Sequence, residues 1–306
     1  MNRLIAIVGP TAIGKSRLAL HLAQDFNGEI VSADSRQVYR YMDIGTAKPG
    51  RQERHLVPHH LIDIINSDQD FSLSQYQQLA YQAIDAIQQR NNLALLVGGS
   101  GLYVWAILEG WGIPQVPPDP EFRRSLEEKA ATGGTDEIYQ QLMKVDPAIA
   151  QNIDRHNVRR LIRALEVYRY TETPASQLQH KKAPPFDTLI IGLTTDRAEL
   201  YRRIDSRVDK MIEQGLVEEV KKLVNMGHGF NLPSMSSIGY KQIGMFLRDE
   251  LTLAAAIQQI KFKTHRFVRH QYSWFRPKDN RIKWFDIQCK QVDLEITALV
   301  ARFISK

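Results

Sequence analysis

The chain has 306 residues, of which 43% are hydrophobic and 24% charged, a composition typical of a soluble globular protein with a sizeable core. Forty Lys and Arg residues against 34 Asp and Glu give a net charge of +6, which favours an anionic partner. The single cysteine, Cys289, excludes a disulfide framework. A predicted strand starts near the N-terminus and no apolar run could span a membrane, so we expect a cytoplasmic protein without a signal peptide or a membrane partner.

The first predicted elements flank a phosphate-binding loop. A buried strand over 4–8 is followed by Gly9-Pro10-Thr11-Ala12-Ile13-Gly14-Lys15-Ser16 and by an amphipathic helix over about 15–26. This sequence matches the full phosphate-loop pattern G-x-x-x-x-G-K-[ST]. The glycines let backbone N–H groups turn toward one anion, the helix N-terminus and Lys15 add positive charge, and the Ser16 hydroxyl can ligate Mg²⁺. The loop is therefore predicted to hold a diphosphate or polyphosphate.

A second predicted strand, over 29–32, leads into the polar, aromatic and basic stretch 34–49. In an open parallel α/β sheet, ligands bind at the carboxyl ends of the strands. We therefore expect this stretch to line a site, although Asp34 taken alone could be an ordinary helix N-cap. A short strand is predicted over 60–64.

A helix over about 72–90 is predicted to precede another buried strand, over 93–97, which ends in the glycine-rich sequence 98–103. A phosphate-loop hydrolase would carry an acidic residue at the end of such a strand, to hold the metal-bound water. The glycines found there argue against a motor or switch ATPase. They leave Ser16 and Asp34 as the residues expected beside Mg²⁺.

The middle of the chain has a different character. A proline-rich exit at 111–119 is followed by three or four predicted helices and no convincing strand. We therefore predict a core formed by 1–113 and 187–306, with an all-helical insertion over 114–186. A predicted helix over about 157–170 follows or carries a cluster of four arginines: Arg155, Arg159, Arg160 and Arg163. A solvated basic face and a partner-binding patch are equally weighted interpretations of this cluster.

The remaining pattern completes an α/β core. A strand over 188–193 and a helix over about 197–214 are followed, near the C-terminus, by a strand over 282–285 and a helix over 292–304. Alternation of buried strands and helices predicts a parallel sheet flanked by helices. The expected fold class is thus α/β, with a core like that of the phosphate-loop NTPases.

A long helix is predicted over about 252–275. Its predicted apolar stripe consists of Leu253, Ile257, Ile260 and Phe267. Its other faces interleave basic and aromatic residues, which is the combination that a phosphate backbone with accessible bases requires. RNA contact by this helix is favoured over the alternative of a solvated basic helix whose aromatic residues pack inward.

Together, these motifs resemble the tRNA dimethylallyltransferases, also called tRNA isopentenyltransferases. The stretches that carry the resemblance are 9–16, 34–39, 42–49, 98–103, 238–242 and 269–276. The phosphate loop is shared by many families, whereas 34–49 is highly specific. One departure is Ser100, where the family more often has Thr; the hydroxyl is kept.

The resemblance implies transfer of a dimethylallyl group from dimethylallyl diphosphate to N6 of the adenosine just 3′ of the anticodon in tRNA, with release of diphosphate. The loop amides, Lys15, Thr11 and Ser16 with Mg²⁺ would stabilise the leaving group, with Arg207 as a further clamp by resemblance. The attacking exocyclic amine must lose a proton, which by resemblance Asp34 accepts. The catalytic residues implied are Thr11, Lys15, Asp34 and Arg207, and the metal ligands implied are Ser16 and Asp34.

The resemblance also implies which residues bind the tRNA. Ser35, Arg36 and Gln37 beside Asp34 would read the flipped adenine and its neighbours, because the base must leave its stack to react. Ser100, Gly101 and Arg123 would lie along the channel. The anticodon stem-loop would be held by Arg159, Arg160, Leu161, Ile162 and Arg163, by Ser236, Ser237, Ile238, Gly239, Tyr240 and Lys241, and by Arg269, His270, Gln271, Tyr272, Ser273, Trp274, Phe275 and Arg276. The helical insertion would close on the RNA.

Three alternatives use the same phosphate loop. An adenylate isopentenyltransferase, which modifies free AMP, ADP or ATP, would have little need for the basic helices. A phosphate-loop small-molecule kinase would bind ATP itself and would leave the stretch 34–49 unexplained. The third is a non-enzymatic, nucleotide-gated RNA-binding module. We expect a monomer, and the sequence leaves open whether the loop binds ATP productively.

Overall fold

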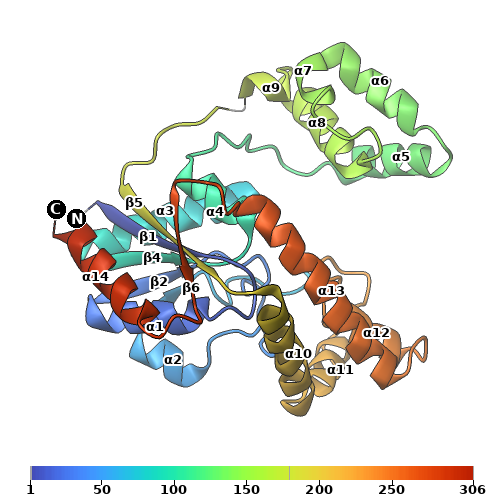
Figure 1. The fold of residues 1–306 in the computed structure, drawn as a ribbon. Coiled ribbons are helices and arrows are strands. Elements are labelled where there is room, and N and C mark those ends of the chain that lie inside the picture. Colours follow the sequence, from blue (N-terminus) through green and yellow to red (C-terminus); the bar gives the residue numbers. More distant parts are fainter. Residues whose placement is uncertain (1, 179, 306) are drawn as a thin grey trace. The chain divides into compact units, whose positions relative to one another are not determined.

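The computed structural model describes residues 2–178 and 180–305, which form two compact units (Figure 1). The core unit consists of the chain up to Leu108 together with the chain from Pro184 onward, and the helical unit consists of Glu109–Ala183. The predicted insertion, 114–186, differs from the helical unit by a few residues at each end. The chain leaves the core directly after helix α4 (Gly101–Leu108), before the prolines that suggested the boundary.

The described part of the core unit contains one six-stranded sheet in the order β3-β2-β4-β1-β5-β6, and all the pairings are parallel. The strands are β1 (Arg3–Val8), β2 (Gly28–Ser32), β3 (His59–His60), β4 (Leu93–Val97), β5 (Asp187–Thr194) and β6 (Ile282–Asp286). Every residue of β2 and β4 is buried, as expected for parallel strands that are covered on both faces. The predicted α/β class is confirmed.

One strand prediction was largely wrong. The chain pairs with β2 only at His59 and His60, whereas the sequence predicted a strand over 60–64. Leu61 and Asp63 have φ angles of 63° and 56°, in the left-handed region that a strand does not use. The apolar residues of this stretch therefore belong to a loop.

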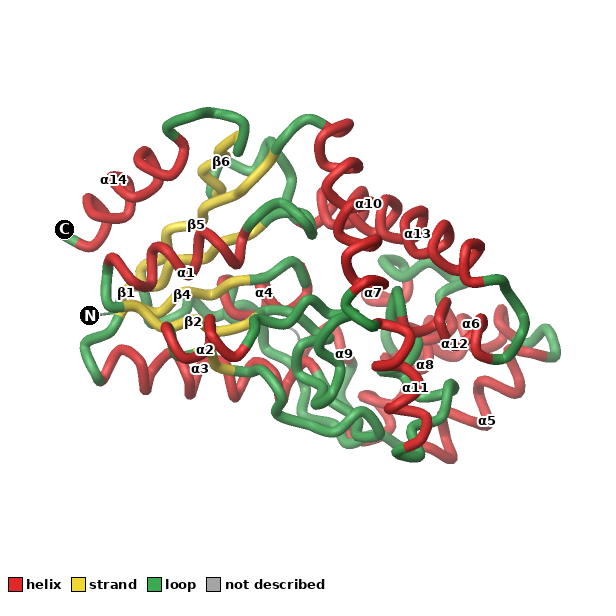
Figure 2. The backbone as a smooth tube through the Cα atoms, turned by 90° about the horizontal axis from the view of Figure 1, so that it is seen from below, coloured by secondary structure: helices red, strands yellow, loops and turns green. Residues whose placement is uncertain are grey.

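The helices of the core unit are α1 (Lys15–Asp25), α2 (Arg51–Leu56), α3 (Leu73–Gln89), α4, α10 (Arg197–Glu213), α11 (Leu216–Asn225), α12 (Tyr240–Leu247), α13 (Leu253–Trp274) and α14 (Val292–Ile304). The crossover through α1 and the crossover through α3 run in opposite directions along the sheet. Right-handed crossovers therefore place α1 and α3 on opposite faces. Helices α10 to α13 contact one another and lie beyond the carboxyl ends of the strands (Figures 1 and 2).

The helical unit has a small apolar core of its own. Its described helices are α5 (Pro120–Ala131), α6 (Thr135–Val145), α7 (Pro147–Ala150), α8 (Val158–Thr171) and α9 (Ala175–Leu178). Ile138 and Leu142 of α6 are buried against Leu161 and Leu165 of α8. Helix α5 begins where Asp119 accepts a hydrogen bond from the Phe122 N–H, with a proline in the first helical position.

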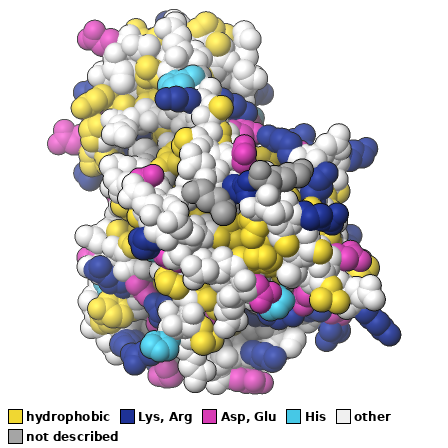
Figure 3. All heavy atoms as spheres, turned by 90° about the vertical axis from the view of Figure 1, so that its left-hand side faces the viewer, with side chains coloured by type: hydrophobic (Ala, Val, Ile, Leu, Met, Phe, Trp, Pro, Cys, Tyr) yellow, Lys and Arg dark blue, Asp and Glu magenta, His cyan; other side chains and the backbone are white. Residues whose placement is uncertain are grey.

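The surface of the core unit differs from side to side. The side that carries the chain termini shows acidic and basic side chains interspersed (Figure 3). Helix α13, on another side of the unit, carries exposed Lys263, Arg266, Arg269 and His270 within two turns. None of the helices described, over 2–178 and 180–305, has the length and apolar character to cross a membrane.

Candidate active site

A cavity of about 400 Å³ lies in the core unit where β1, β2 and β4 end. It is lined by segments that are far apart in the sequence but adjacent at this edge of the sheet. They include the phosphate loop with the start of α1, residues 34–37, residues 45–47 with Pro49, residues 98–100, Arg207 of α10, residues 236–239 and Gln271 of α13. The structure thus brings all four predicted catalytic residues and several predicted tRNA-binding residues to one cavity, as expected for the carboxyl edge of a parallel sheet.

The backbone of the phosphate loop has positive φ angles at two positions where the sequence has glycine. Gly9 has a φ of 135°, and a Cβ on it would lie 2.5 Å from the Leu193 carbonyl oxygen, so no larger residue fits. Gly14, with a φ of 106°, directly precedes α1. The Lys15 ammonium donates to the carbonyl oxygens of Gly9, at 3.0 Å, and Pro10, at 2.7 Å. Because α1 begins at Lys15, its N-terminal dipole also acts at this cavity.

Two cations and one carboxylate dominate the electrostatics of the cavity. The pKa of Lys15 is lowered to about 7, because burial disfavours the ammonium and the Arg207 cation acts in the same direction, while Asp34 opposes both. Burial likewise lowers the pKa of Arg207, and Asp34 again opposes the shift. The Arg207 guanidinium donates to the Thr11 hydroxyl at 3.1 Å. An anion bound beside Lys15 and Arg207 would relieve their mutual repulsion.

Asp34 follows the carboxyl end of β2, at the same edge of the sheet as the phosphate loop. Its Oδ1 accepts the Arg36 N–H at 2.8 Å, and within residues 2–178 and 180–305 no donor hydrogen-bonds to its Oδ2. The Ser100 hydroxyl accepts the neighbouring Ser35 N–H at 3.1 Å. A Cβ on Gly98 would lie 2.1 Å from the Ala33 carbonyl oxygen, so the glycine permits the close approach of the two loops. These contacts leave one carboxylate oxygen available for a proton.

The predicted magnesium ligands were Ser16 and Asp34, and both line the cavity. In the part of the chain that the structure describes, no group of three or more His, Cys, Asp and Glu side chains could hold a metal ion. A hydroxyl and a carboxylate are the oxygen ligands that Mg²⁺ prefers, and Mg²⁺ is commonly held by few protein ligands together with phosphate oxygens and water. The residues present therefore fit a magnesium ion that is bound together with a diphosphate.

Gln37 has an arrangement that the sequence did not predict. Its Oε1 accepts the Ser32 hydroxyl at 3.0 Å, and its Nε2 donates to the carbonyl oxygens of Thr46, at 3.4 Å, and Ala47, at 3.3 Å. Both ends of the amide are thus engaged with the protein. Reading a base with Gln37 would require these bonds to be exchanged.

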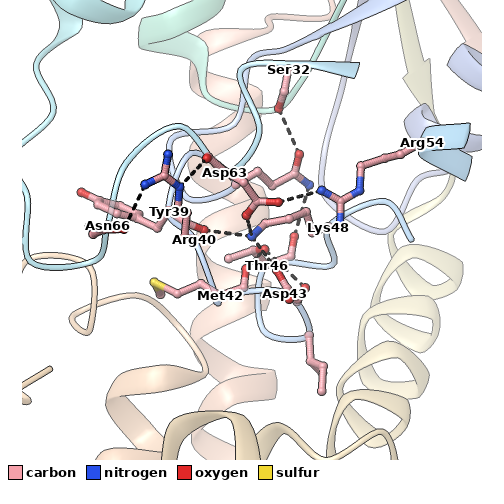
Figure 4. A network of polar contacts seen from close by, with 12 residues as sticks. Ser32, Tyr39, Arg40, Met42, Asp43, Thr46, Lys48, Arg54, Asp63 and Asn66 are labelled. Carbon is pink, nitrogen blue, oxygen red and sulfur yellow. Dashed lines mark hydrogen bonds and ion pairs between the residues drawn. The ribbon is translucent and has the colours of Figure 1, made fainter. Parts of the chain in front are cut away.

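The polar residues of 39–48 mainly stabilise their own loop (Figure 4). The buried Lys48 ammonium donates to the Tyr39 carbonyl oxygen at 2.8 Å and to the carboxylates of Asp43 and Asp63, at 2.6 Å each. Arg54 binds the other oxygen of Asp63 at 2.7 Å. The contacts of Lys48 and Arg54 therefore stabilise the loop 39–48, which follows Asp34 to Gln37 in the chain.

Sequence reasoning missed Glu219 of α11. Its carboxylate accepts three consecutive backbone N–H groups, from Asp43 at 3.0 Å, Ile44 at 2.8 Å and Gly45 at 3.1 Å, and also the Tyr240 hydroxyl at 2.6 Å. No signal near residue 219 points to a partner so far away in the sequence. The carboxylate fixes the loop that carries Thr46, Ala47 and Lys48.

Several predicted tRNA-binding side chains are buried instead. Leu161, Ile162, Tyr240 and Phe275 are at most 3% exposed, so their side chains face the interior, and their binding of tRNA stays a prediction. Trp274 covers Gly101, where a Cβ would lie 2.2 Å from the indole. Gly101 and Trp274 therefore form a close contact between α4 and α13.

Two predicted arginines of the helical unit are paired with an acid. Arg123 donates to both oxygens of the buried Glu166 carboxylate at 2.8 Å, and Arg163 donates to the same carboxylate at 2.6 Å. Burial would raise the pKa of Glu166, but hydrogen bonds from Arg123, the Asp119 N–H and Arg163 outweigh it and lower that pKa. Arg159 and Arg160 are exposed on the same helix. Arg155, just before this helix, is also exposed, so Arg155, Arg159 and Arg160 remain candidates for a solvent-facing basic patch.

A second, shallow hollow adjoins the cavity. It is lined by Ile238, Lys263, Arg266, Phe267, Arg269, His270 and Ser273. Phe267 was predicted to lie on the apolar stripe of α13, but it is 40% exposed. Ile238 and Phe267 line both the hollow and the cavity, so a basic and aromatic surface leads directly to the cavity mouth.

The comparison with known proteins identifies the family. The sequence model of the family described as IPP transferase matches residues 37–278. This chain belongs to the IPP transferase family. The tRNA dimethylallyltransferase of Herpetosiphon aurantiacus is 52% identical over 279 residues, which cover 91% of this chain and 89% of that relative. The tRNA dimethylallyltransferase of Roseiflexus sp. is 51% identical over 280 residues, covering 92% of each.

Solved structures agree with this assignment. The tRNA isopentenylpyrophosphate transferase of Bacillus halodurans has a TM-score of 0.72 and 40% identity, and the match covers 98% of this chain and 96% of that one. A eukaryotic dimethylallyltransferase acting on tRNA has a TM-score of 0.83 and 27% identity, and the match covers 100% of this chain and 80% of that one. The predicted family and fold class are confirmed.

Proposed function

We propose that this enzyme transfers the dimethylallyl group of dimethylallyl diphosphate to N6 of the adenosine that lies 3′-adjacent to the anticodon in tRNA. The observation that carries this proposal is the continuity of the site. The cavity holds a diphosphate loop and a carboxylate, and its mouth shares Ile238 and Phe267 with an exposed basic and aromatic surface. An enzyme acting on free AMP would not need that surface.

The two ends of the cavity suit the two halves of the reaction. The bond between the first prenyl carbon and the diphosphate oxygen breaks as the bond between this carbon and N6 forms. Negative charge then develops on the diphosphate, where Lys15, Arg207 and the loop amides are already oriented to stabilise it. Thr11 contributes by holding Arg207 through its hydroxyl.

The proton lost by N6 goes to Asp34 in this proposal. Its Oδ1 is oriented by the Arg36 N–H, which leaves Oδ2 to accept the proton. The products are N6-dimethylallyl adenosine in the tRNA, diphosphate and a protonated Asp34, which releases its proton to solvent. Ser16 and Asp34 would hold Mg²⁺, which supplies neutralisation of the diphosphate charge when bound.

The remaining features of the proposal concern the setting of the reaction. We infer that dimethylallyl diphosphate is the prenyl donor and that the enzyme acts in the cytoplasm as a monomer. The single exposed Cys289 is compatible with a reducing compartment. The exposed arginines Arg159 and Arg160 of the helical unit and Arg269 and Arg276 near the end of α13 are the proposed contacts of the anticodon stem-loop.

A transfer assay tests the proposal. Purified protein, Mg²⁺ and labelled dimethylallyl diphosphate are incubated with unmodified tRNA in one reaction and with AMP or ATP in another. Label in tRNA alone is the expected result. Label in the free nucleotide would replace the proposal with an adenylate isopentenyltransferase, and phosphoryl transfer from ATP would replace it with a kinase.

A further inference from the structure

Gln271 is a buried polar residue within the proposed RNA-facing part of α13. It is 3% exposed, whereas the two residues before it, Arg269 and His270, are exposed. A buried side-chain amide is stable only where its donor and acceptor are both satisfied. The hydrogen-bond partners of the Gln271 side chain therefore show which segments lie against the inner side of this helix.

The amide of Gln271 joins two loops of the cavity. Its Oε1 accepts the Thr11 N–H of the phosphate loop at 2.9 Å, and its Nε2 donates to the Gly99 carbonyl oxygen at 3.0 Å. A Cβ on Gly99 would lie 2.3 Å from Nε2, so the amide has its place only because residue 99 is glycine. Neither loop belongs to α13, and both line the cavity.

Each of these loops leads to a group that the proposed reaction uses. Thr11 accepts the hydrogen bond of Arg207, and Ala12 after it has a φ of 64°, which is strained for a residue with a Cβ and persists only where its surroundings fix it. On the other side, the residue after Gly99 is Ser100, whose hydroxyl accepts the N–H of the residue that follows Asp34. One amide thus contacts both the diphosphate side and the proton-accepting side.

We propose that Gln271 is a positioning residue that couples the binding of RNA on α13 to the binding of diphosphate in the phosphate loop. RNA bound to the outer side of α13 would hold the helix that carries this amide and, through the bond to the Thr11 N–H, would hold the phosphate loop in the form that receives diphosphate. Linkage makes the effect reciprocal. This inference rests on the proposed function, because it requires tRNA to bind α13.

The coupling is measured with the full chain, unmodified tRNA and inorganic diphosphate with Mg²⁺. The Kd for diphosphate is determined with and without saturating tRNA. In the natural protein, we expect tRNA to lower this Kd by at least about fivefold, the lower end of typical couplings between sites. In Gln271→Met, which keeps the side-chain volume but has neither hydrogen bond, we expect the ratio of the two Kd values to fall to about one, with both ligands still bound.

Two further variants separate positioning from folding. Gly99→Ala places a methyl group against the Gln271 amide and should reduce the ratio in the same way without changing residue 271. Gln258→Met is the matched control, because Gln258 is exposed on the same helix, and its ratio should equal that of the natural protein. Thermal unfolding of each variant shows whether it is folded. If Gln271→Met does not fold, the Gly99→Ala ratio decides.

The outcomes distinguish this inference from the proposed function. A ratio of one in the natural protein, or an undiminished ratio in folded Gln271→Met or in Gly99→Ala, overturns the inference while the proposed function stands. Failure of the natural protein to bind tRNA overturns the proposed function and the inference together. A Kd ratio near one in Gln271→Met and in Gly99→Ala, together with the natural ratio in Gln258→Met, supports the coupling.

Discussion

The phosphate loop and helix α13 both lie at the cavity, yet they carry their residues in different ways. In the loop, the backbone itself forms the predicted phosphate-binding surface, so a motif of glycines with one lysine is enough to recognise it. In α13, neighbouring residues face opposite sides, since Arg269 is exposed, Gln271 is buried and Phe275 is only 1% exposed. A continuous run of helical sequence is therefore not one binding surface, because successive residues are distributed around the axis.

The largest expected effect concerns the acid that faces the loop across the cavity. Asp34→Asn should lower the rate of transfer by about 10²–10⁴, because the amide cannot accept the N6 proton. Binding of tRNA should be retained, because the exposed basic surface is unchanged. Single-turnover transfer and tRNA binding, measured on the same preparation, check this. Turnover like that of the natural protein would remove Asp34 from proton transfer.

A pair of phenylalanines sharpens the contrast between the two sides of α13. Phe275→Ala should lower the free energy of unfolding by about 3–5 kcal/mol, because a buried ring is removed. Phe267→Ala should leave stability nearly unchanged and weaken tRNA binding by about 1–3 kcal/mol, the value of stacking one base on an aromatic ring. Urea unfolding and tRNA titration of both variants check this. Equal effects of the two substitutions on tRNA binding would contradict the two-sided description.

The lowered pKa of Lys15 makes the loop sensitive to pH. The pKa of Lys15 is about 7 in the protein without ligand. Bound diphosphate favours the ammonium and raises this pKa, so above pH 7 Lys15 takes up a proton when diphosphate binds. Affinity should thus be fully developed below pH 7 and fall by up to about tenfold per pH unit above it, until the raised pKa is reached. Titration of Mg-diphosphate between pH 6 and 9, compared with Lys15→Met, isolates this contribution. The same pH profile in both proteins would assign it to the ligand.

The smallest expected effect is electrostatic. Arg269→Ala should weaken tRNA binding moderately and reduce the slope of log affinity against log salt by about one, since one phosphate contact is lost. Arg302→Ala on α14 is the control, because that arginine is exposed on a different helix of the core unit. Binding measured at several salt concentrations decides. An unchanged slope in Arg269→Ala would mean that Arg269 does not contact the backbone.

Structural features that depend only on residues close together in the chain could be predicted from the sequence. Helix α3 begins with a capping box that its sequence specifies, in which the Ser72 side chain is bonded to the Gln75 N–H and the Gln75 side chain to the Ser72 N–H. Buried strands and long amphipathic helices were likewise found within a few residues of their predicted bounds. Periodicity and caps act over one or two turns, so one sequence is enough to recognise them.

Features that depend on distant partners were not predictable. Helix α11 was missed, and with it Glu219, whose partners at 43–45 are far away in the chain. The inward direction of Gln271 and the outward direction of Phe267 reverse the usual preference of amide and aromatic side chains. The loops that the Gln271 amide bonds, at Thr11 and Gly99, explain the inward direction of that side chain.

The carboxylate of Glu219 also shows a second solution to the problem that the phosphate loop solves. Three consecutive N–H groups converge on it as they would on a bound anion, forming what is called a nest. The anion in this nest is the Glu219 side chain itself, so it does not dissociate and no anion from solution takes its place. In the proposed reaction the phosphate loop would bind and release a diphosphate in each cycle, whereas the Glu219 carboxylate stays bound to the N–H groups of Asp43, Ile44 and Gly45 and keeps their loop in place.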